Sequence, residues 1–307
     1  MAHNHEHAGR GPGHSHAPPG NNAAFAIGVS LNLAFVVAEV VYGWSANSLA
    51  LLSDAGHNLS DVFGLLIAWG AIHIGKSLPT KRRTYGLRRS SILAALVNAV
   101  VLLIAVGGIT WEAVGRFVHP EVVAGGTVIW VAAVGVVINT ATALLFMAGR
   151  HRDLNIRGAF LHMAADAGVS VGVIVIGLAI RVTGWQWLDP AVSLLIGAVI
   201  VWGTWGLLRE SVNLAMDAVP AGIDPDAVKE YLSGLPGVRA VHDLHIWGMS
   251  TTETALTAHL VMPIPPADDK FLHEVSHALH ERFEIGHATI QIEHGDVDCH
   301  LAPAHVV

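Results

Sequence analysis

Six long apolar stretches, separated by short polar connections, occupy the first two thirds of the chain. A helix of about 20 residues crosses the roughly 30 Å of hydrocarbon in a bilayer, and an open strand there would leave its backbone groups unpaired. The six stretches are Ala23–Trp44, Asn47–Ile74, Ser90–Val114, Val122–Ala148, Gly158–Val182 and Trp185–Leu208. The pattern therefore predicts an all-α, six-helix transmembrane domain over residues 21–212.

Lysine and arginine are concentrated in two of the five connections between these stretches. The second and fourth connections carry nine of them: Lys76, Lys81, Arg82, Arg83, Arg88, Arg89, Arg150, Arg152 and Arg157. The other three connections carry only Arg116, and Arg181 lies just before the last of them. Because cytoplasmic loops hold the excess of Lys and Arg, we expect these two connections and both chain ends to lie in the cytoplasm.

The pattern changes at about residue 213 to that of a small soluble domain. Helical spacing and strand-like alternation predict, in order, a helix at Asp226–Ser233, strands at Val238–Met249 and Glu253–Met262, a helix at Ala267–Phe283 and a strand at Ala288–Ile292. The order αββαβ suits a small sheet covered on one face by helices. Residues 213–307 are therefore predicted to form an α+β cytoplasmic domain, whose modest core dimerisation would help to stabilise.

The composition agrees with a membrane protein and excludes several other classes. The chain is 52% hydrophobic and 13% charged, whereas soluble domains are about 25% charged. A net charge of -7 offers no basic surface to a nucleic acid, and the single cysteine, Cys299, excludes an internal disulfide framework or a CxxC site. Histidine is in excess, with 20 residues against 17 Lys and Arg. A protein that handles a ligand of histidine is the expectation.

Five histidines lie in the first 20 residues, among glycine and proline: His3, His5, His7, His14 and His16. Such a composition cannot bury a core, so residues 1–20 are predicted to be a disordered cytoplasmic tail. The tail could capture metal weakly, or be a solvated segment without a required role.

Two pairs of ionisable residues inside the predicted spans share one spacing. His57 and Asp61 stand four residues apart, as do His162 and Asp166, so each pair lies on one helix face. A charge at mid-bilayer costs about 2.5–3.5 kcal/mol on insertion scales. Two such faces brought together would offer two imidazole nitrogens and two carboxylate oxygens, a tetrahedral set that suits zinc. We predict a metal site there; the alternative is that each pair is a hydrogen-bonded couple that holds helices together.

Other polar residues in the spans have a less specific meaning. Glu39 and Glu112 lie near span ends and are interpreted as interfacial. Asp54, one turn before His57, could line a path to the outside or serve helix packing. His162 lies about one turn from the start of its predicted span, whereas His57 is near mid-helix. Either the fifth helix begins earlier, near residue 153, or the site lies closer to the cytoplasm.

The C-terminal domain offers a second group of candidate ligands. His242 and His259 lie on adjacent predicted strands, and Glu293 ends the last one. These three side chains could converge on a second metal ion, or could be ordinary polar residues of a half-exposed sheet. The histidines of the long helix, His273, His277 and His280, fit a solvent-facing surface.

Several motifs together resemble the cation diffusion facilitator family. They are D-A-G-H-x3-D in the second span, H-M-A-A-D in the fifth, H-D-L-H-I-W after the sixth and T-Y-G-L-R-R-S-S-I-L-A-A-L at the entry to the third. The chain is most similar to bacterial zinc-exporting members, because its loops are short. It differs at Ser91, where members usually carry an acidic residue, and Thr80, Arg83 and Leu87 stand where some relatives have a loop metal site. No metal site is expected in that loop.

The resemblance implies a homodimer in a bacterial cytoplasmic membrane. Each multi-pass protomer would export Zn2+ from the cytoplasm in exchange for protons, without enzymatic activity, and a ferredoxin-like cytoplasmic domain would sense metal. His57, Asp61, His162 and Asp166 match the family's transport site residue by residue. The resemblance also implies a cytoplasmic zinc site at His242, His259 and Glu293. Divalent metal ions, protons and the lipid bilayer are then the expected partners, and nucleic acid is not.

Other functions remain open at this stage. A membrane metal sensor without transport could carry the same ligands, and the transported ion could be Cd2+, Co2+ or Mn2+. An intramembrane metallohydrolase is disfavoured because none of the predicted spans contains an HExxH motif and four protein ligands leave no position for a catalytic water. A haem carrier with His57 and His162 as axial ligands would leave the neighbouring carboxylates unexplained.

Overall fold

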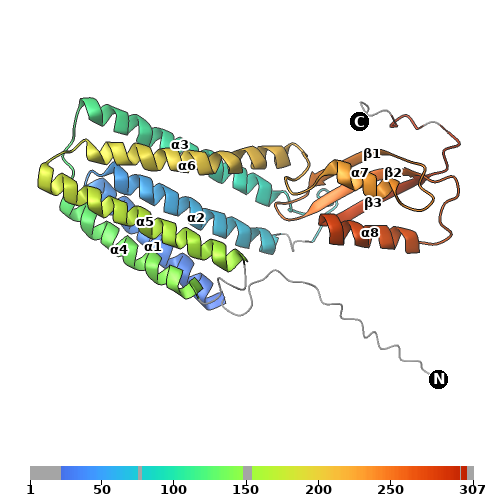
Figure 1. Cartoon of the computed structure of the whole chain (residues 1–307), viewed down its shortest axis with the longest axis horizontal. Coiled ribbons are helices and arrows are strands. Elements are labelled where there is room, and N and C mark those ends of the chain that lie inside the picture. The colour runs from blue at the N-terminus through green and yellow to red at the C-terminus, as the bar shows by residue number, and fades with distance from the viewer. Residues whose placement is uncertain (1–21, 75–77, 148–153, 298, 303–307) are drawn as a thin grey trace, which may run out of the picture.

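Six long helices pack side by side, and a small α/β domain lies at one end of them (Figure 1). The computed structural model describes residues 22–74, 78–147, 154–297 and 299–302. The helices are α1 (Asn22–Ser45), α2 (Leu49–Ile74), α3 (Ser90–Val118), α4 (Gly125–Met147), α5 (Leu154–Thr183) and α6 (Leu188–Ala215). Each overlaps one of the six predicted stretches, so the prediction of a helical transmembrane domain is confirmed. The predicted tail, residues 1–20, lies outside the described residues.

Four of these helices are long and apolar enough to cross a membrane, judged over the described residues. They are Ser90–Val118, Gly125–Leu144, Met163–Thr183 and Leu188–Ala215. The described apolar part of α1 is shorter, Ser30–Ser45, and α2 carries Asp54, His57 and Asn58 within its length. The chain is thus a multi-pass membrane protein in which α2 is a polar member of the bundle.

The helices form two groups that α2 connects. α3 packs against α6, and α4 packs against both α5 and α1, while α2 contacts α1, α3, α5 and α6. Phe35, Leu51, Val128 and Val173 belong to the buried core shared by α1, α2, α4 and α5. Gly135 permits this close approach, because a Cβ atom there would lie 2.6 Å from Phe35 Cζ. These contacts place the polar face of α2 against α1 and α5.

The C-terminal domain has the predicted element order. It consists of α7 (Pro225–Ser233), β1 (Ala240–Gly248), β2 (Thr254–Val261), α8 (Lys270–Phe283) and β3 (Ile285–Glu293). β1 pairs antiparallel with β2, and β2 pairs parallel with β3. Asp224 caps α7, since its Oδ1 accepts a hydrogen bond from the Asp226 backbone N–H at 3.0 Å.

The two helices of this domain cover the same face of the sheet. Leu232 of α7 and Leu279 of α8 join Leu256, Ala258 and Leu260 of β2 in one buried core. Because side chains alternate along a strand, the residues of β2 with odd numbers, including His259, face the opposite side of the sheet. That side carries the candidate ligands.

The two domains touch at the start of α3. The Thr251 backbone N–H donates to Ser91 Oγ at 3.2 Å, and Arg88 Nη1 lies 3.2 Å from Glu253 Oε1. Arg89 also binds the Asp217 carboxylate just beyond α6. Ser91 is thus a buried interdomain contact.

Candidate metal sites

The predicted intramembrane site lies where α2 and α5 approach each other. His57 Nε2 is 3.5 Å from Asp166 Oδ1, and the Asp166 side chain is only 3% exposed. One member of each predicted pair therefore meets the other across the two helices. The side chains of Asp61 and His162 lie outside the part of the chain that the structure describes. Their positions on the helices are nevertheless known.

The backbone puts the remaining two candidates at a common level. α2 and α5 run in opposite directions, because α2 ends and α5 begins at the end of the bundle next to the C-terminal domain (Figure 1). Asp61 follows His57 by four residues and His162 precedes Asp166 by four. Both are displaced by one turn, about 6 Å at 1.5 Å per residue, toward the same end. The four residues therefore form two levels of two on facing helices.

The helix that carries His162 begins earlier than predicted. α5 starts at Leu154 rather than Gly158, which corresponds to the alternative of an earlier start near residue 153. His162 thus lies two turns inside its helix instead of one. The depth mismatch between the two pairs becomes correspondingly smaller.

Glu39 is not interfacial, and that prediction is wrong. Its side chain is completely buried, and its Oε2 accepts a hydrogen bond from Asn58 Nδ2 at 3.0 Å. Position along a span indicates depth in the membrane, but rotation about the helix axis decides exposure, and Glu39 faces α2. Glu112, by contrast, is half exposed and binds Arg116 on its own helix at 3.2 Å.

Buried polar residues of α1 and α2 lie beside the His57–Asp166 contact. Asp54 is 1% exposed and lies within electrostatic reach of Glu39, His57 and Asp166. Neither Asp54 oxygen, nor Glu39 Oε1, accepts a hydrogen bond of normal geometry from the described residues. This location is compatible with both predicted roles of Asp54, which are to line a path for the ion and to pack α2 against its neighbours.

Asp189, at the start of α6, binds the first residues of α2, a role that was not predicted from the sequence. It accepts hydrogen bonds from Ser48 Oγ at 2.5 Å, the Leu49 backbone N–H at 2.8 Å and the Ala50 backbone N–H at 3.3 Å. The Leu49 and Ala50 N–H groups are the first backbone donors of α2 and have no partner within their own helix. Asp189 therefore caps α2 from another helix, at the end of the bundle far from the C-terminal domain.

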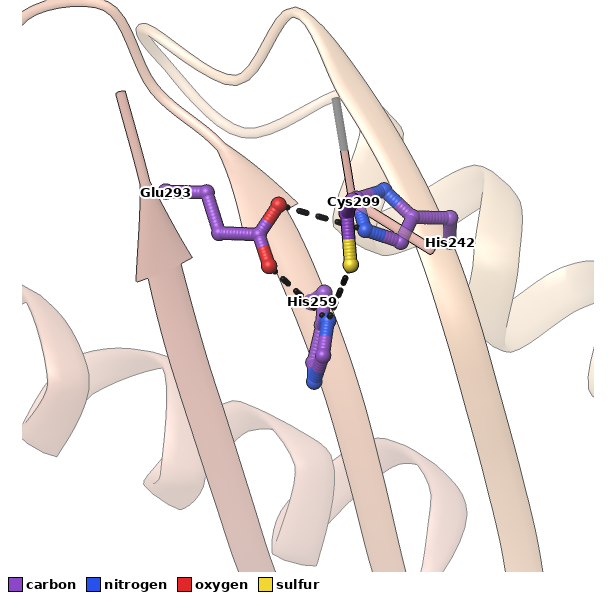
Figure 2. A group of neighbouring side chains, drawn as sticks. All are labelled: His242, His259, Glu293 and Cys299. Atoms are coloured by element: carbon purple, nitrogen blue, oxygen red, sulfur yellow. Dashed lines mark hydrogen bonds and ion pairs between the residues drawn. The ribbon is translucent and has the colours of Figure 1, made fainter. Parts of the chain in front are cut away.

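A second cluster of metal-ligating side chains lies in the C-terminal domain (Figure 2). Glu293 Oε2 is 3.3 Å from His242 Nε2, and Glu293 Oε1 is 3.0 Å from His259 Nδ1. Cys299 Sγ is 3.8 Å from the same Nδ1. One donor atom from each of the four lies within 4.8 Å of the others. The three predicted residues thus converge, and Cys299 joins them.

Strand register explains why three of the donors meet. His242 pairs directly with His259, and Glu293 pairs with Val261, two residues further along β2. All three side chains stand on the sheet face opposite to the helices. Cys299 is not among the ligands predicted from the sequence. Nothing local indicates that the segment after β3 returns to the sheet.

Comparison with known proteins places both domains in one family. Residues 25–214 match the family described as cation efflux transmembrane domain, and residues 220–295 match the cation efflux protein, cytoplasmic domain. The zinc transporter ZitB of Escherichia coli (strain K12) is 40% identical over 311 residues, covering 98% of this chain and 96% of the relative. The cation efflux system protein CzcD of Alcaligenes sp. (strain CT14) is 39% identical over 285 residues, 92% of this chain and 90% of the relative.

A third relative carries a wider description. The cadmium, cobalt and zinc/H(+)-K(+) antiporter of Bacillus subtilis (strain 168) is 33% identical over 286 residues, 92% of each chain. All three relatives align with the transmembrane and the C-terminal domains together. The chain therefore belongs to the cation efflux family, the cation diffusion facilitators that its motifs resemble.

Proposed function

We propose that the protein is a secondary active transporter that exports Zn2+ from the cytoplasm in exchange for protons. The observation that carries this proposal is the contact between His57 and the buried Asp166 carboxylate, on two helices of a membrane-spanning bundle. A zinc transporter and a metal/proton antiporter among the relatives support the same function. A metal sensor without transport would use the same ligands but would produce no flux.

The transported ion is bound by His57, Asp61, His162 and Asp166. Two facing helices supply two donors at each of two levels about one turn apart, and an ion between the levels can reach all four. Two carboxylates cancel the charge of a dication in a site with little water, and neutral imidazoles complete the coordination. The site needs no further ligand, which suits binding and release rather than hydrolysis.

Proton exchange follows from the ligand chemistry. Imidazoles must be neutral and carboxylates ionised to bind metal, so binding releases protons, and imidazole titrates near neutral pH. Each proton that moves down the membrane potential gains about 2.3 kcal/mol per 100 mV. Two protons per Zn2+ would make the exchange electroneutral. Rocking of α2 and α5 relative to the other helices would open the site to each side in turn.

The membrane arrangement belongs to the same proposal. All six helices cross a bacterial cytoplasmic membrane, with both chain ends and the C-terminal domain in the cytoplasm. The αββαβ order of that domain is the basis for a ferredoxin-like fold and for a homodimer formed through it. Its metal cluster, His242, His259 and Glu293, would sense the cytoplasmic zinc that the bundle exports.

Zinc flux in proteoliposomes tests the function. Purified protein should move Zn2+ faster when a pH gradient drives protons in the opposite direction than when there is no gradient. Without a pH gradient, added Zn2+ should itself drive protons in the direction opposite to the zinc flux. A fluorescent zinc indicator and a pH indicator in the lumen measure the two fluxes. Zinc binding without either flux would instead identify a sensor. Zinc flux indifferent to the gradient would refute the exchange.

Replacing His57 with Asp should weaken the discrimination against Cd2+. The substitution exchanges an imidazole nitrogen for an oxygen, so the set becomes harder and its fit to the small zinc ion becomes looser. The ratio of Cd2+ to Zn2+ transport, measured in the same vesicles, should rise several-fold. His119→Asp, at an exposed position after α3, is the control and should leave the ratio unchanged. An unchanged ratio in His57→Asp would show that its side chain does not control selectivity.

A further inference from the structure

We propose that Cys299 is the fourth ligand of a closed zinc site in the cytoplasmic domain, and that Asp243 is the positioning residue that orients His259 within it. The inference rests on the cytoplasmic metal cluster and deepens it. It does not depend on transport through the membrane domain. The proposed site binds zinc through the Cys299 thiolate and through Nδ1 of His259, in addition to His242 and Glu293.

The distances between donor atoms in the cluster are close to those around a bound zinc ion. Zinc binds nitrogen and oxygen at about 2.0–2.2 Å and sulfur at about 2.3 Å, which places adjacent donors of a tetrahedron about 3.3–3.8 Å apart. His242 Nε2 lies 3.3 Å from Glu293 Oε2, and His259 Nδ1 lies 3.0 Å from Glu293 Oε1 and 3.8 Å from Cys299 Sγ. With one donor atom taken from each residue, all four lie within 4.8 Å of one another. Small side-chain adjustments would therefore suffice for all four to bind one ion.

The chain returns to the sheet through a glycine turn. Gly295, two residues after β3, has a φ of 79°, and a Cβ atom there would lie 2.9 Å from Val261 Cγ1. A left-handed conformation in so little space favours glycine. The turn directs the following residues back over the strands, where Cys299 points at His259 (Figure 2). The sulfur is thus delivered by the fold to the three donors of the sheet.

A bulge in β1 brings Asp243 to the same cluster. Val241, Leu244 and Ile246 all contact the hydrophobic core, so two consecutive residues, His242 and Asp243, occupy the interval that normally holds one. The register with β2 shifts at this point, and Asp243 has a φ of 48°. Such a bulge turns a side chain that would face the helices toward the opposite side of the sheet.

Asp243 contacts the nitrogen of His259 that does not face the other donors. Its Oδ2 is 3.4 Å from His259 Nε2, whereas His259 Nδ1 faces Glu293 and Cys299. Metal-bound histidines usually donate their second ring N–H to a carboxylate, which fixes both the ring and its tautomer. Asp243 therefore keeps the proton on Nε2 and leaves Nδ1 free to bind zinc. Its Oδ1 also contacts His245 Nε2 at 2.9 Å.

The ligand set distinguishes this site from the intramembrane one. Two nitrogens, one oxygen and one thiolate close the coordination of zinc and leave no open position. A site with a thiolate holds its ion more firmly than one made of imidazoles and carboxylates alone, and suits retention rather than passage. Metal binding would also fix the segment after β3 to the sheet.

The absence of any other cysteine makes thiol alkylation specific for Cys299. In full-length protein carrying Asp166→Ala, which disables the intramembrane site, Zn2+ should slow alkylation by iodoacetamide at least ten-fold. His259→Ala in the same background should abolish this protection, whereas His273→Ala on the exposed face of α8 should preserve it. Cobalt substitution should give a thiolate-to-metal charge-transfer band that Cys299→Ser removes. Equal alkylation rates with and without Zn2+, or a band that survives Cys299→Ser, would refute ligation by Cys299.

Two substitutions of Asp243 separate positioning from backbone conformation. Asp243→Asn keeps the size of the side chain, and Asp243→Gly relieves the left-handed backbone, but both remove the carboxylate. Each should weaken Co2+ binding about 10–100-fold while the charge-transfer band persists at saturating metal. Wild-type affinity in Asp243→Gly would show that the residue serves only the bulge, and would overturn its positioning role. Because these measurements record metal binding, they remain decisive even if the protein transports nothing.

Discussion

Asp166→Ala is expected to abolish zinc transport, with a fall in rate of roughly a hundred-fold or more. Asp166 is buried and faces His57, so its removal takes both a ligand and a negative charge from the site. Loss of one member of a buried charged pair costs about 3–5 kcal/mol, and each 1.4 kcal/mol is a factor of ten in affinity. The ion would remain without full neutralisation in a region of little water.

Initial rates of zinc uptake into proteoliposomes measure this effect. Asp166→Asn retains the volume of the side chain and should fail almost as completely, because it lacks the charge. Glu112→Ala is the matched control: it also removes one carboxylate from a membrane helix, but that side chain is half exposed and binds only Arg116 among the described residues. Normal transport by Asp166→Ala would mean that the transport site has been assigned to the wrong residues.

The positions of the helices could be predicted because lipid selects apolar segments directly. All six predicted stretches overlap helices, but their ends differ: α6 continues to Ala215, beyond the predicted Leu208, and α5 begins at Leu154. Outside the hydrocarbon, hydropathy no longer distinguishes a helix from a loop. The ends depend instead on tertiary contacts, such as Arg89 with Asp217 just after α6.

Candidate ligands could be predicted where spacing implies a shared face. The i, i+4 pairs mark one face of α2 and one of α5, and His57 and Asp166 do meet. Strand alternation and antiparallel pairing likewise brought His242 opposite His259. In both cases the periodicity of a regular element carries the information.

The roles of residues that depend on how a helix is rotated about its axis, or on where the chain reverses direction, could not be predicted. The Glu39 side chain points toward Asn58 because of the way α1 is rotated about its axis relative to α2. Hydropathy along the sequence does not indicate this rotation. Cys299 reaches its partners through the turn at Gly295. The bulge at Asp243 does leave a signal in the sequence, since the apolar residues of β1 change from odd to even numbers between Val241 and Leu244. A prediction that assumes regular alternation of inward and outward side chains does not detect it.

Asp189→Ala is expected to destabilise the membrane domain by about 3–5 kcal/mol, the cost of removing one partner from a buried charged network. The Ser48 hydroxyl and the Leu49 and Ala50 backbone N–H groups would lose their shared acceptor, and unpaired buried donors cost about 1–3 kcal/mol each. Arg116, whose Nη1 lies 3.9 Å from Asp189, would also lose a buried counter-charge.

Thermal unfolding in detergent should therefore show a clear fall in Tm for Asp189→Ala and a smaller one for Asp189→Asn, which keeps one acceptor oxygen. Glu121→Ala provides the control, because Glu121 also pairs with Arg116, at 3.3 Å, but is half exposed and should contribute less than about 1 kcal/mol. Zinc affinity of the protein that remains folded should be unchanged, since Asp189 contacts the first residues of α2, about two helical turns before His57. A Tm for Asp189→Ala equal to that of Glu121→Ala would mean that α2 does not need a cap from α6.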